Sequence, residues 1–352
     1  MKRRKADDVS EGPSTKCART SQSSDSRNLT PESLPEFDIL YPDPKNPKES
    51  IKSGHLPVQK VVGVVEKHVW GVLGEFDQDY VVLPNEVWSA MKPYKSFLTN
   101  GVKFCRGECF FARADDHARI PENGNQSYLG RILEVRALDA CRVYALIEWL
   151  YWPEELPAST RYPGEKNPRR GRRPWHGYHE VIASNALDVV NATSIDDHAE
   201  VYHWDEETDA EPPTKSDLIY WRQTFDHRTC KLSRLREMCV CNNPRNPDNF
   251  MIKCDNKNCG SLFHQHCLVE PTLARIYQEK IACHKRGSKA STGVTTGLRC
   301  ATKPWAKALV GNIREEEPLM IEITDIRQGV GDGKEKVSLE DVMCPKCNEK
   351  IQ

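Results

Sequence analysis

"MCVCNNPRNPDNFMIKCDNKNCGSLFHQHCLVE", residues 238–270, decides the fold of the C-terminal part of the chain together with "VMCPKCNEKIQ", residues 342–352. Cysteine and histidine recur in both stretches at the short spacings that metal ligands need. Unrelated buried cysteines are the alternative, but two tetrahedral zinc sites need eight ligands, and the two stretches supply them. The sequence therefore predicts two structural Zn²⁺ ions, held by Cys239, Cys241, Cys254, Cys259, His264, Cys267, Cys344 and Cys347.

The order of these ligands resembles that of a PHD finger, here over residues 236–350. The resemblance implies a cross-brace, with Cys239, Cys241, His264 and Cys267 on one ion and Cys254, Cys259, Cys344 and Cys347 on the other. A RING finger would place its histidine fourth and not fifth, which disfavours a zinc-dependent ubiquitin ligase. The long gap between Cys267 and Cys344 predicts an insertion at about residues 270–341, in which we interpret Cys283 and Cys300 as free thiols.

This finger departs from the PHD fingers that bind methylated lysine. The family's aromatic positions correspond here to Leu262 and Arg245, and only Met251 keeps an expected residue type. Without aromatic rings there is little cation–π attraction for a methylammonium group. We therefore interpret the finger as structural or partner-binding.

The chain before the finger consists of short β-prone runs, among them "VQKVVGVVEKHVWGVL" and "CRVYALIEWLYW", separated by Gly, Pro, Asn and Asp. This pattern predicts an antiparallel barrel or sandwich that ends near residue 226. Because side chains alternate along a strand, one face of the second run is expected to carry Val143, Ala145, Ile147, Trp149 and Tyr151. The other face is expected to carry Leu146, Leu150 and Trp152.

Four segments of this region resemble a BAH (bromo-adjacent homology) domain over roughly residues 92–226: "FLTNGVKFCRGECFFARAD", "SYLGRILEV", "IEWLYWPEE" and "GRRPWHGYHEVIASNALDVVNATSI". The BAH-then-PHD order is similar to plant BAH–PHD readers (short life, early bolting in short days) and to fungal effector-of-Polycomb-repression proteins. The resemblance implies a mainly β chain, with a BAH-type antiparallel β-barrel followed by a small cross-braced two-zinc PHD finger. Residues 56–91 are expected to form a β-rich lead-in, and residues 1–50 are expected to be a disordered tail.

The BAH resemblance also implies an aromatic cage made by Tyr128, Trp149 and Tyr151. Electron-rich rings attract a quaternary ammonium, whereas an unmethylated lysine loses more hydration on entering such a box. Ordinary core packing is the alternative for these rings. Glu154 and Glu155 are interpreted as a solvated turn.

Two further surfaces are candidates for binding. Trp175, His176, Glu180 and Asn185 are secondary candidates for a peptide groove. Residues 161–174, "RYPGEKNPRRGRRP", carry six cations against Glu165 and are a candidate for contact with DNA phosphates, a solvated loop being the default.

Composition limits the classes of function. The chain has a net charge of −1 and no run of apolar residues long enough for a membrane span, and its N-terminus lacks the apolar region of a secretory signal. Lys2, Arg3, Arg4 and Lys5 form a basic cluster that is either a nuclear import signal or a solvated charged terminus. No nucleophile–base constellation or phosphate-binding loop indicates an enzyme.

We predict a non-enzymatic nuclear chromatin reader. Its BAH cage would bind trimethyl-lysine on a histone tail, with the Polycomb-type repressive mark as the expected target, and the protein would act with co-repressor proteins in silencing. The alternatives are a protein-binding zinc scaffold without methyl-lysine recognition and, less favoured, the ubiquitin ligase.

Overall fold

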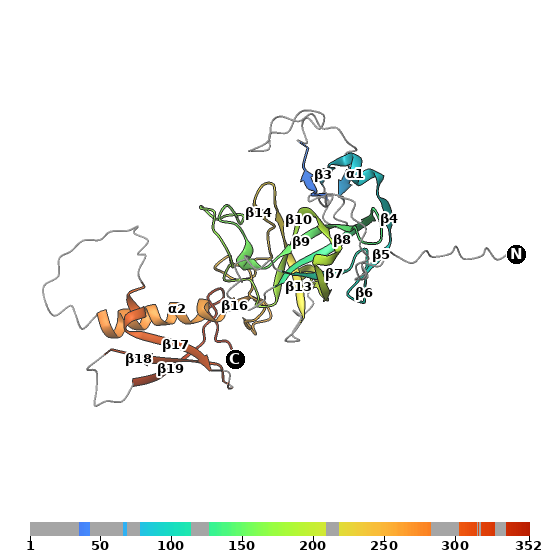
Figure 1. Ribbon diagram of the computed structural model, residues 1–352. Helices are drawn as coiled ribbons and strands as arrows, with labels where there is room; N and C mark the ends of the chain where they lie inside the picture. Colours follow the sequence, from blue (N-terminus) through green and yellow to red (C-terminus); the bar gives the residue numbers. More distant parts are fainter. Residues whose placement is uncertain are drawn as a thin grey trace, which may run out of the picture. The chain divides into compact units, whose positions relative to one another are not determined.

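The computed structural model describes residues 35–42, 66–68, 78–113, 127–208, 218–282, 303–314, 316, 318–327 and 336–352. It divides into two compact units (Figure 1). We call Met1–Arg173 with His179–Arg234 the β unit, and Pro174–Tyr178 with Leu235–Gln352 the cysteine unit. The short segment Pro174–Tyr178 thus belongs to the cysteine unit although the β unit flanks it on both sides in the sequence.

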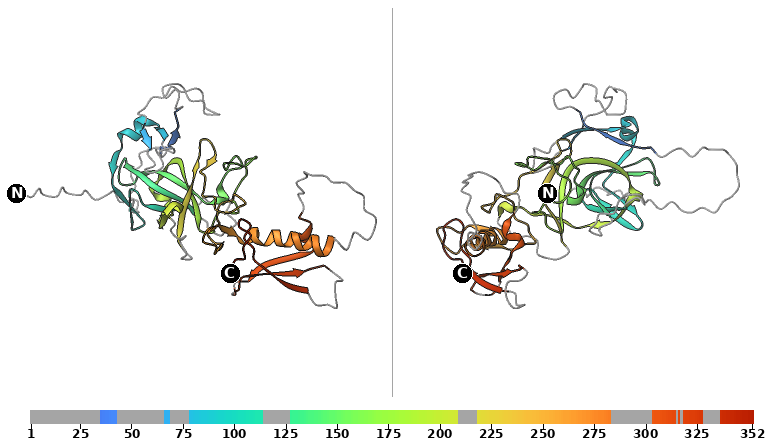
Figure 2. Two further views of the ribbon diagram at one scale, coloured as in Figure 1. Left: turned by 180° about the vertical axis from the view of Figure 1, so that it is seen from behind. Right: turned by 90° about the vertical axis from the view of Figure 1, so that its left-hand side faces the viewer.

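The β unit is built on a nine-stranded sheet with the order β11-β7-β8-β9-β10-β13-β12, with β4 paired to β8 and β14 paired to β13. Its long strands are curved (Figure 2). The strands are β4 (Lys92–Tyr94), β7 (Cys109–Arg113), β8 (Ser127–Ala137), β9 (Val143–Tyr151), β10 (Glu180–Asn191), β11 (Ile195–Ala199), β12 (Val201–His203), β13 (Ile219–Asp226) and β14 (Lys231–Leu232). Short 3₁₀ helices cover Pro153–Glu155, Ala192–Ser194 and Glu206–Thr208.

Most strand pairs are antiparallel, as predicted, but β13 pairs in parallel with both β10 and β12. A parallel pair needs a long connection, because the chain must return to the same end of the sheet before the second strand begins. Between Asn191 and Ile219 the chain provides such a connection, which carries β11 and β12.

The alternation predicted for β9 is confirmed. Val143, Ala145 and Ile147 are buried in a cluster with Phe97, Phe104, Phe110 and Ile132, and Trp149 packs against the same cluster. Phe97 and Phe104 come from the hairpin of β5 (Ser96–Thr99) and β6 (Val102–Cys105). On the opposite face, Leu146 is buried in a second cluster, and Leu150 and Trp152 in a third.

Part of the N-terminal region packs on this opposite face, which corrects the expectation of a disordered tail through residue 50. β1 (Asp38–Leu40) pairs with β3 (Gln78–Leu83), which also pairs with β2 (Glu66–His68). Phe37 contacts Trp88 of α1 (Asn85–Ala90) edge to face, with ring centroids 5.5 Å apart. Phe37, Ile39 and Tyr41 alternate along the segment and pack on one buried cluster, so this short run buries enough apolar surface to be ordered.

The cysteine unit combines a small hairpin with a helix and a second sheet. β15 (Met251–Lys253) pairs with β16 (Leu262–His264), and α2 (Gln265–Ile276) follows directly, continuing into a π-helical turn at Tyr277–Ala282. A 3₁₀ helix (Pro304–Lys307) precedes β17 (Leu309–Arg314), β18 (Met320–Asp325) and β19 (Lys336–Asp341), which form an antiparallel sheet. The described part of the predicted insertion is therefore folded.

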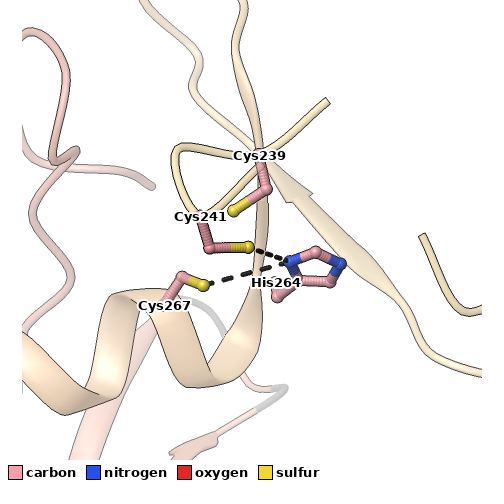
Figure 3. A group of neighbouring side chains, drawn as sticks. All are labelled: Cys239, Cys241, His264 and Cys267. Atoms are coloured by element: carbon pink, nitrogen blue, oxygen red, sulfur yellow. Dashed lines mark hydrogen bonds between the residues drawn. The ribbon is translucent and has the colours of Figure 1, made fainter. Parts of the chain in front are cut away.

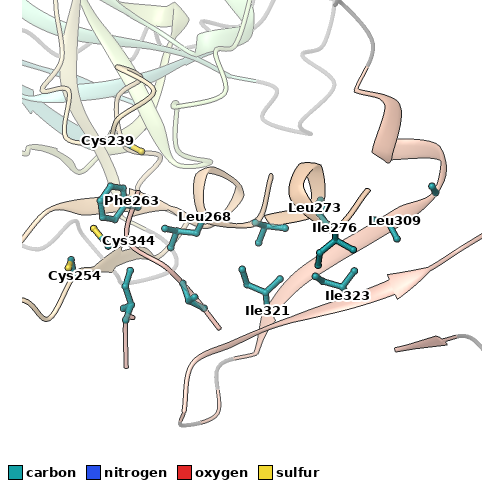
Figure 4. Close-up of a cluster of buried hydrophobic side chains, with 14 residues drawn as sticks. Cys239, Cys254, Phe263, Leu268, Leu273, Ile276, Leu309, Ile321, Ile323 and Cys344 are labelled. Carbon is teal, nitrogen blue, oxygen red and sulfur yellow. The ribbon is translucent and has the colours of Figure 1, made fainter. Parts of the chain in front are cut away.

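The helix α2 lies along this sheet (Figures 1 and 2). Leu268 and Leu273 of α2 share a buried cluster with Ile321 and Ile323 of β18 (Figure 4). Gly311 of β17 permits the close approach, because an added Cβ would lie 2.8 Å from Cγ1 of Val269. Cys239, Cys254 and Cys344 belong to the same cluster, so the cysteines and the insertion share one core.

Some sequence predictions fall outside the described residues: the N-terminal residues 1–34 and 43–50 with the basic cluster Lys2–Lys5, and the thiols Cys283 and Cys300. Within the described residues, no helix is long and apolar enough to cross a membrane.

Candidate functional site

The first group of predicted ligands converges at the start of α2. Cys239, Cys241, His264 and Cys267 place one ligand atom each within 4.8 Å of one another (Figure 3). Nδ1 of His264 lies 3.4 Å from Sγ of Cys241 and 3.9 Å from Sγ of Cys267. His264 ends β16 and Cys267 lies in the first turn of α2, so the strand-to-helix junction brings these two ligands together.

The imidazole of His264 is oriented for coordination. Its Nε2 lies 3.1 Å from the carbonyl oxygen of Pro244 and donates a hydrogen bond to it, because a carbonyl can only accept. This bond leaves the lone pair of Nδ1 facing the three thiols. A histidine ligand in a metal site is commonly held by such a bond from its second ring nitrogen.

The second group of predicted ligands brings together two cysteines that precede α2 and two cysteines near the C-terminus. Cys254, Cys259, Cys344 and Cys347 also place their sulfur atoms within 4.8 Å of one another. Sγ of Cys254 lies 3.6 Å from Sγ of Cys347, and Sγ of Cys259 lies 3.7 Å from Sγ of Cys344. Four sulfurs at about 2.3 Å from a tetrahedral zinc ion would be roughly 3.8 Å apart, so both groups fit that ion.

Sharp backbone turns next to the ligands bring the members of each group together. Asn242, Gly260 and Asn348 each have a positive φ directly after a ligand, where the chain must reverse sharply. The backbone N–H of Asn348 donates to the carbonyl of Cys344 at 2.9 Å, which closes the turn around the final pair. The structure thus assembles the two ligand sets in the cross-braced arrangement that the PHD resemblance implied.

The aromatic residues predicted to form a cage lie on β8 and β9 of the β unit. The rings of Tyr128 and Trp149 meet edge to face, with centroids 6.0 Å apart and planes at 64°. Tyr128 is 38% exposed, and Trp149 and Tyr151 are half-buried. Opposite Trp149 in the ladder stands Gly130, where an added Cβ would lie 2.7 Å from the ring of Phe110. The glycine lets Phe110 fill the space beneath the aromatic group.

Tyr151 occupies the same strand face as Trp149 but makes its ring contact elsewhere. Its ring stands edge to face against Phe225 of β13, with centroids 5.7 Å apart. Burial, and next the carboxyl of Glu155, raise the pKa of Tyr151 to about 12, so its phenol stays neutral. Tyr128 and Trp149 therefore contact each other, while Tyr151 is fixed from the neighbouring strand.

Two residues that sequence reasoning missed border this aromatic group. The indole Nε1 of Trp149 donates to Oδ2 of Asp188 on β10 at 3.3 Å. The hydroxyl of Tyr41 accepts a bond of 2.8 Å from the N–H of Leu187, next to Asp188, and burial raises the pKa of Tyr41 to about 12. The Asp188 carboxylate thus adds negative charge beside the rings. Its place in the BAH-like segment was the only signal in the sequence that could have pointed to it.

The two carboxylates after β9 are not in a solvated turn, which corrects the sequence interpretation. Glu154 forms an ion pair with Arg172. Glu155 accepts a bond of 2.7 Å from the backbone N–H of Trp152, and burial raises the pKa of its carboxyl to about 7. Both side chains therefore hold the chain where it leaves β9.

Comparison with known proteins gives two relatives from Arabidopsis thaliana. Chromatin remodeling protein SHL is 29% identical over 154 residues, 43% of this chain and 60% of that protein. Chromatin remodeling protein EBS is 27% identical over 164 residues, 46% of this chain and 61% of that protein. The predicted resemblance to BAH–PHD proteins is confirmed.

The matched region spans about three fifths of the length of each of these BAH–PHD relatives. No family model matches the chain. A solved structure of the yeast Rsc2 BAH domain matches with a TM-score of 0.28 and 12% identity, over 43% of this chain and 56% of that one.

Two of the residues predicted to line a secondary peptide groove, Glu180 and Asn185, are buried in the β unit. Glu180 is fully buried and binds the guanidinium of Arg222 at 3.0 Å, which leaves it no surface for a peptide. Asn185 is buried at the β10–β13 junction, where its side chain bonds Asp226 and the backbone N–H of His227. It supports the strand that carries Asp188.

Trp175 and His176 belong to the cysteine unit. Trp175 is buried and lines a pocket of about 550 Å³ together with Phe250 and Asp248. The backbone carbonyl of His176 accepts a bond from the side chain of Asn246. These contacts give both residues a role in the fold of the PHD-like unit.

The basic segment 161–174 is less uniform than its sequence suggests. Arg172 pairs with Glu154, and Arg173 is buried, where it pairs with Glu165. The remaining cations are exposed: Arg161, Lys166, Arg169 and Arg170. Because Glu165 is neutralised by a buried arginine, no acid of this segment offsets the charge of these four.

Proposed function

We propose that the chain is a non-enzymatic chromatin reader of the nucleus, whose β unit binds trimethyl-lysine on a histone tail. The contact of Tyr128 with Trp149, on a strand face that also carries Tyr151, supports this most directly. Such partly exposed rings offer their faces to a quaternary ammonium, with roughly 0.5–2 kcal/mol per good contact. The chromatin-remodeling relatives support a role at chromatin.

Asp188 favours a cationic ligand over an apolar one. Its carboxylate touches the indole of Trp149, so a positive charge in front of the rings gains both cation–π and longer-range Coulomb attraction. More specifically, we propose that the trimethyl-lysine is a Polycomb-type repressive mark and that the protein recruits co-repressor proteins in silencing. Both statements rest on the BAH–PHD proteins that the chain resembles.

The two ligand groups of the cysteine unit are proposed to hold structural Zn²⁺. Three thiols with an imidazole, and four thiols, are the donor sets of closed structural zinc sites, which leave no coordination position for a substrate. The proposed role of the metal is to fold the unit. The predicted contact of residues 161–174 with DNA would use residues other than the aromatic group on β8 and β9.

A titration of the full chain with histone-tail peptides tests the reader function. We expect micromolar binding of a trimethylated peptide, roughly −8 kcal/mol, and much weaker binding of the same peptide unmethylated. Trp149→Ala and Tyr128→Ala should each weaken binding at least tenfold. Tyr202→Ala is the matched control, because Tyr202 is a 46% exposed aromatic of the same unit outside the cage.

The outcome separates a reader from a scaffold. If the two cage variants keep the circular dichroism spectrum of the wild type and bind the peptide equally well, the rings are packing residues and the protein is a zinc-dependent scaffold. Trp149→Phe keeps an aromatic face and is expected to retain part of the affinity, which makes the result independent of any loss of folding in the alanine variant.

A further inference from the structure

Two basic segments that are far apart in the sequence meet on the β unit. The backbone N–H of Arg161 donates to the carbonyl of Cys230 at 2.8 Å, and the N–H of Leu232 donates to the carbonyl of Arg161 at 2.9 Å. These bonds form a parallel bridge between Arg161 and Lys231. The loop around residues 161–170 therefore lies beside the turn that joins β13 to β14.

The second segment adds its own cations to the surface. Arg228 and Lys231 are exposed, and they flank the turn after Asp226. Asp226 is the one acid of residues 226–232, and its carboxylate accepts bonds from Asn185 and Thr229. The joint surface, which we call the basic surface, comprises Arg161, Lys166, Arg169, Arg170, Arg228 and Lys231.

These cations have no acidic partners in the described part of the chain, where none of the six forms an ion pair. The guanidinium of Arg169 donates to the carbonyl of Arg172 at 3.1 Å, which holds it near the chain, while its charge remains uncompensated. A chain with a net charge of −1 thus carries six exposed positive charges on two segments that meet at the bridge between Arg161 and Lys231. Such a local field selects a polyanion.

The same turn connects this surface to the aromatic group. Phe225, which contacts the ring of Tyr151, directly precedes Asp226 and the turn that carries Arg228. The N–H of His227 donates to Asn185 on β10, three residues before Asp188. The turn that carries Arg228 is therefore connected to β9 through Phe225 and to β10 through His227.

We propose that the basic surface binds the phosphate backbone of duplex DNA, so that the β unit engages a nucleosome through the tail and through DNA at once. The second half of this statement rests on the proposed reader function, but the DNA contact does not. Two linked contacts raise affinity because the second binding event occurs at a high effective concentration. Phosphate contacts carry no sequence information, so binding is expected to be independent of DNA sequence.

The test measures binding of the full zinc-loaded chain to a short fluorescent DNA duplex by anisotropy, over a range of salt concentrations. If all six cations engage phosphates, log K should fall with log salt with a slope of roughly −5. Arg169→Glu with Arg170→Glu, and separately Arg228→Glu with Lys231→Glu, should each make the slope shallower by about 2 and weaken binding roughly tenfold.

The matched control is Lys95→Glu with Lys103→Glu. It makes the same change in net charge at exposed lysines around the β5–β6 hairpin, and it should bind DNA like the wild type. If the Arg228/Lys231 variant behaves like this control, the basic surface is not a DNA site and the proposal is wrong. Tighter binding to single-stranded RNA, or to phosphatidylcholine vesicles containing phosphatidylserine, would also overturn it.

A parallel titration with the trimethylated tail peptide keeps the two proposals apart. The basic-surface variants should bind the free peptide like the wild type, because their cations lie outside the cage. Loss of DNA binding with intact peptide binding supports the inference. DNA binding that depends on these cations, in a chain that binds no methylated peptide, would refute the reader function and leave the DNA site standing.

Discussion

The indole Nε1 of Trp149 donates a hydrogen bond of 3.3 Å to Oδ2 of Asp188, across the β9–β10 pair. The bond fixes the plane of an aromatic ring that is half-buried and contacts Tyr128. It also holds a carboxylate next to the ring faces. Asp188 therefore has two effects on a cation bound there: it orients a ring, and it supplies negative charge.

Asp188→Asn should weaken binding of a trimethylated peptide about fivefold. The amide oxygen can still accept from the indole, so the ring stays in place, but the Coulomb attraction of about 1 kcal/mol is lost. Calorimetric titration measures the change. Asp139→Asn is the control, since it removes an exposed aspartate of the same unit that is bonded to Arg142. Equal affinity of Asp188→Asn and wild type would show that the carboxylate serves only the fold.

Glu155 should make the stability of the β unit fall as pH rises. Burial raises its pKa in the folded chain to about 7, above the 4.5 that is usual for a glutamate carboxyl in water. The folded state therefore binds more protons than the unfolded state between these values, and stability present below about pH 4.5 is lost as pH rises through 7. Urea unfolding of the full chain, followed by tryptophan fluorescence at pH 5 and pH 8, measures the difference.

Glu155→Gln is the matched variant for this pH dependence. The amide can still accept from the N–H of Trp152, and it carries no charge at any pH. We expect this variant to lose less stability than the wild type between pH 5 and pH 8. If both chains lose the same free energy of unfolding over that range, Glu155 is not the group responsible.

Sequence reasoning succeeded where the pattern was local. Ligand spacing predicted the eight metal ligands, and the PHD resemblance implied which cysteines gather around His264. The period of two predicted that Trp149 and Leu150 face different cores. The fold class follows from the same short-range signals. Both features depend on residues close together in the chain, or on a known order of ligands.

The residues that were missed depend on pairings between distant segments. Tyr41 lies 146 positions before Leu187, whose backbone it contacts, and the short β1 run carries little periodicity. Glu180 was assigned to a groove because nothing in the sequence shows that Arg222 lies in parallel β13 beside it. Likewise, the contact of Arg161 with Lys231 could not be read from either basic segment alone.

Gly311→Ala should destabilise the cysteine unit by about 1–3 kcal/mol, a typical cost of overpacking. The added Cβ would lie 2.8 Å from Cγ1 of Val269 and 3.1 Å from Cδ2 of Leu273, so α2 must move away from β17. Thermal unfolding followed by circular dichroism measures the loss. Asn312→Ala is the control, since Asn312 is the exposed neighbour on the same strand. Equal melting temperatures for the two variants would contradict the packing seen at Gly311.

Removal of metal should unfold the cysteine unit and leave the β unit intact. Cys239, Cys254 and Cys344 are buried in one core with Phe263 and Leu268. Without metal, the three thiols and one imidazole of the first group and the four thiols of the second cannot keep that core together. In such small sites the free energy of metal binding is folding free energy. We expect EDTA to abolish the circular dichroism signal of α2, and added Zn²⁺ to restore it.

Single cysteine variants make this prediction specific. The wild type should carry two Zn²⁺ per chain by elemental analysis, whereas Cys254→Ser removes one of the four thiols of the second group and should carry at most one. Cys105→Ser is the control, because Cys105 is a half-buried thiol of the β unit that belongs to neither group. A wild-type protein that loses all its metal to EDTA and keeps its helical signal would show that apolar packing alone folds the unit.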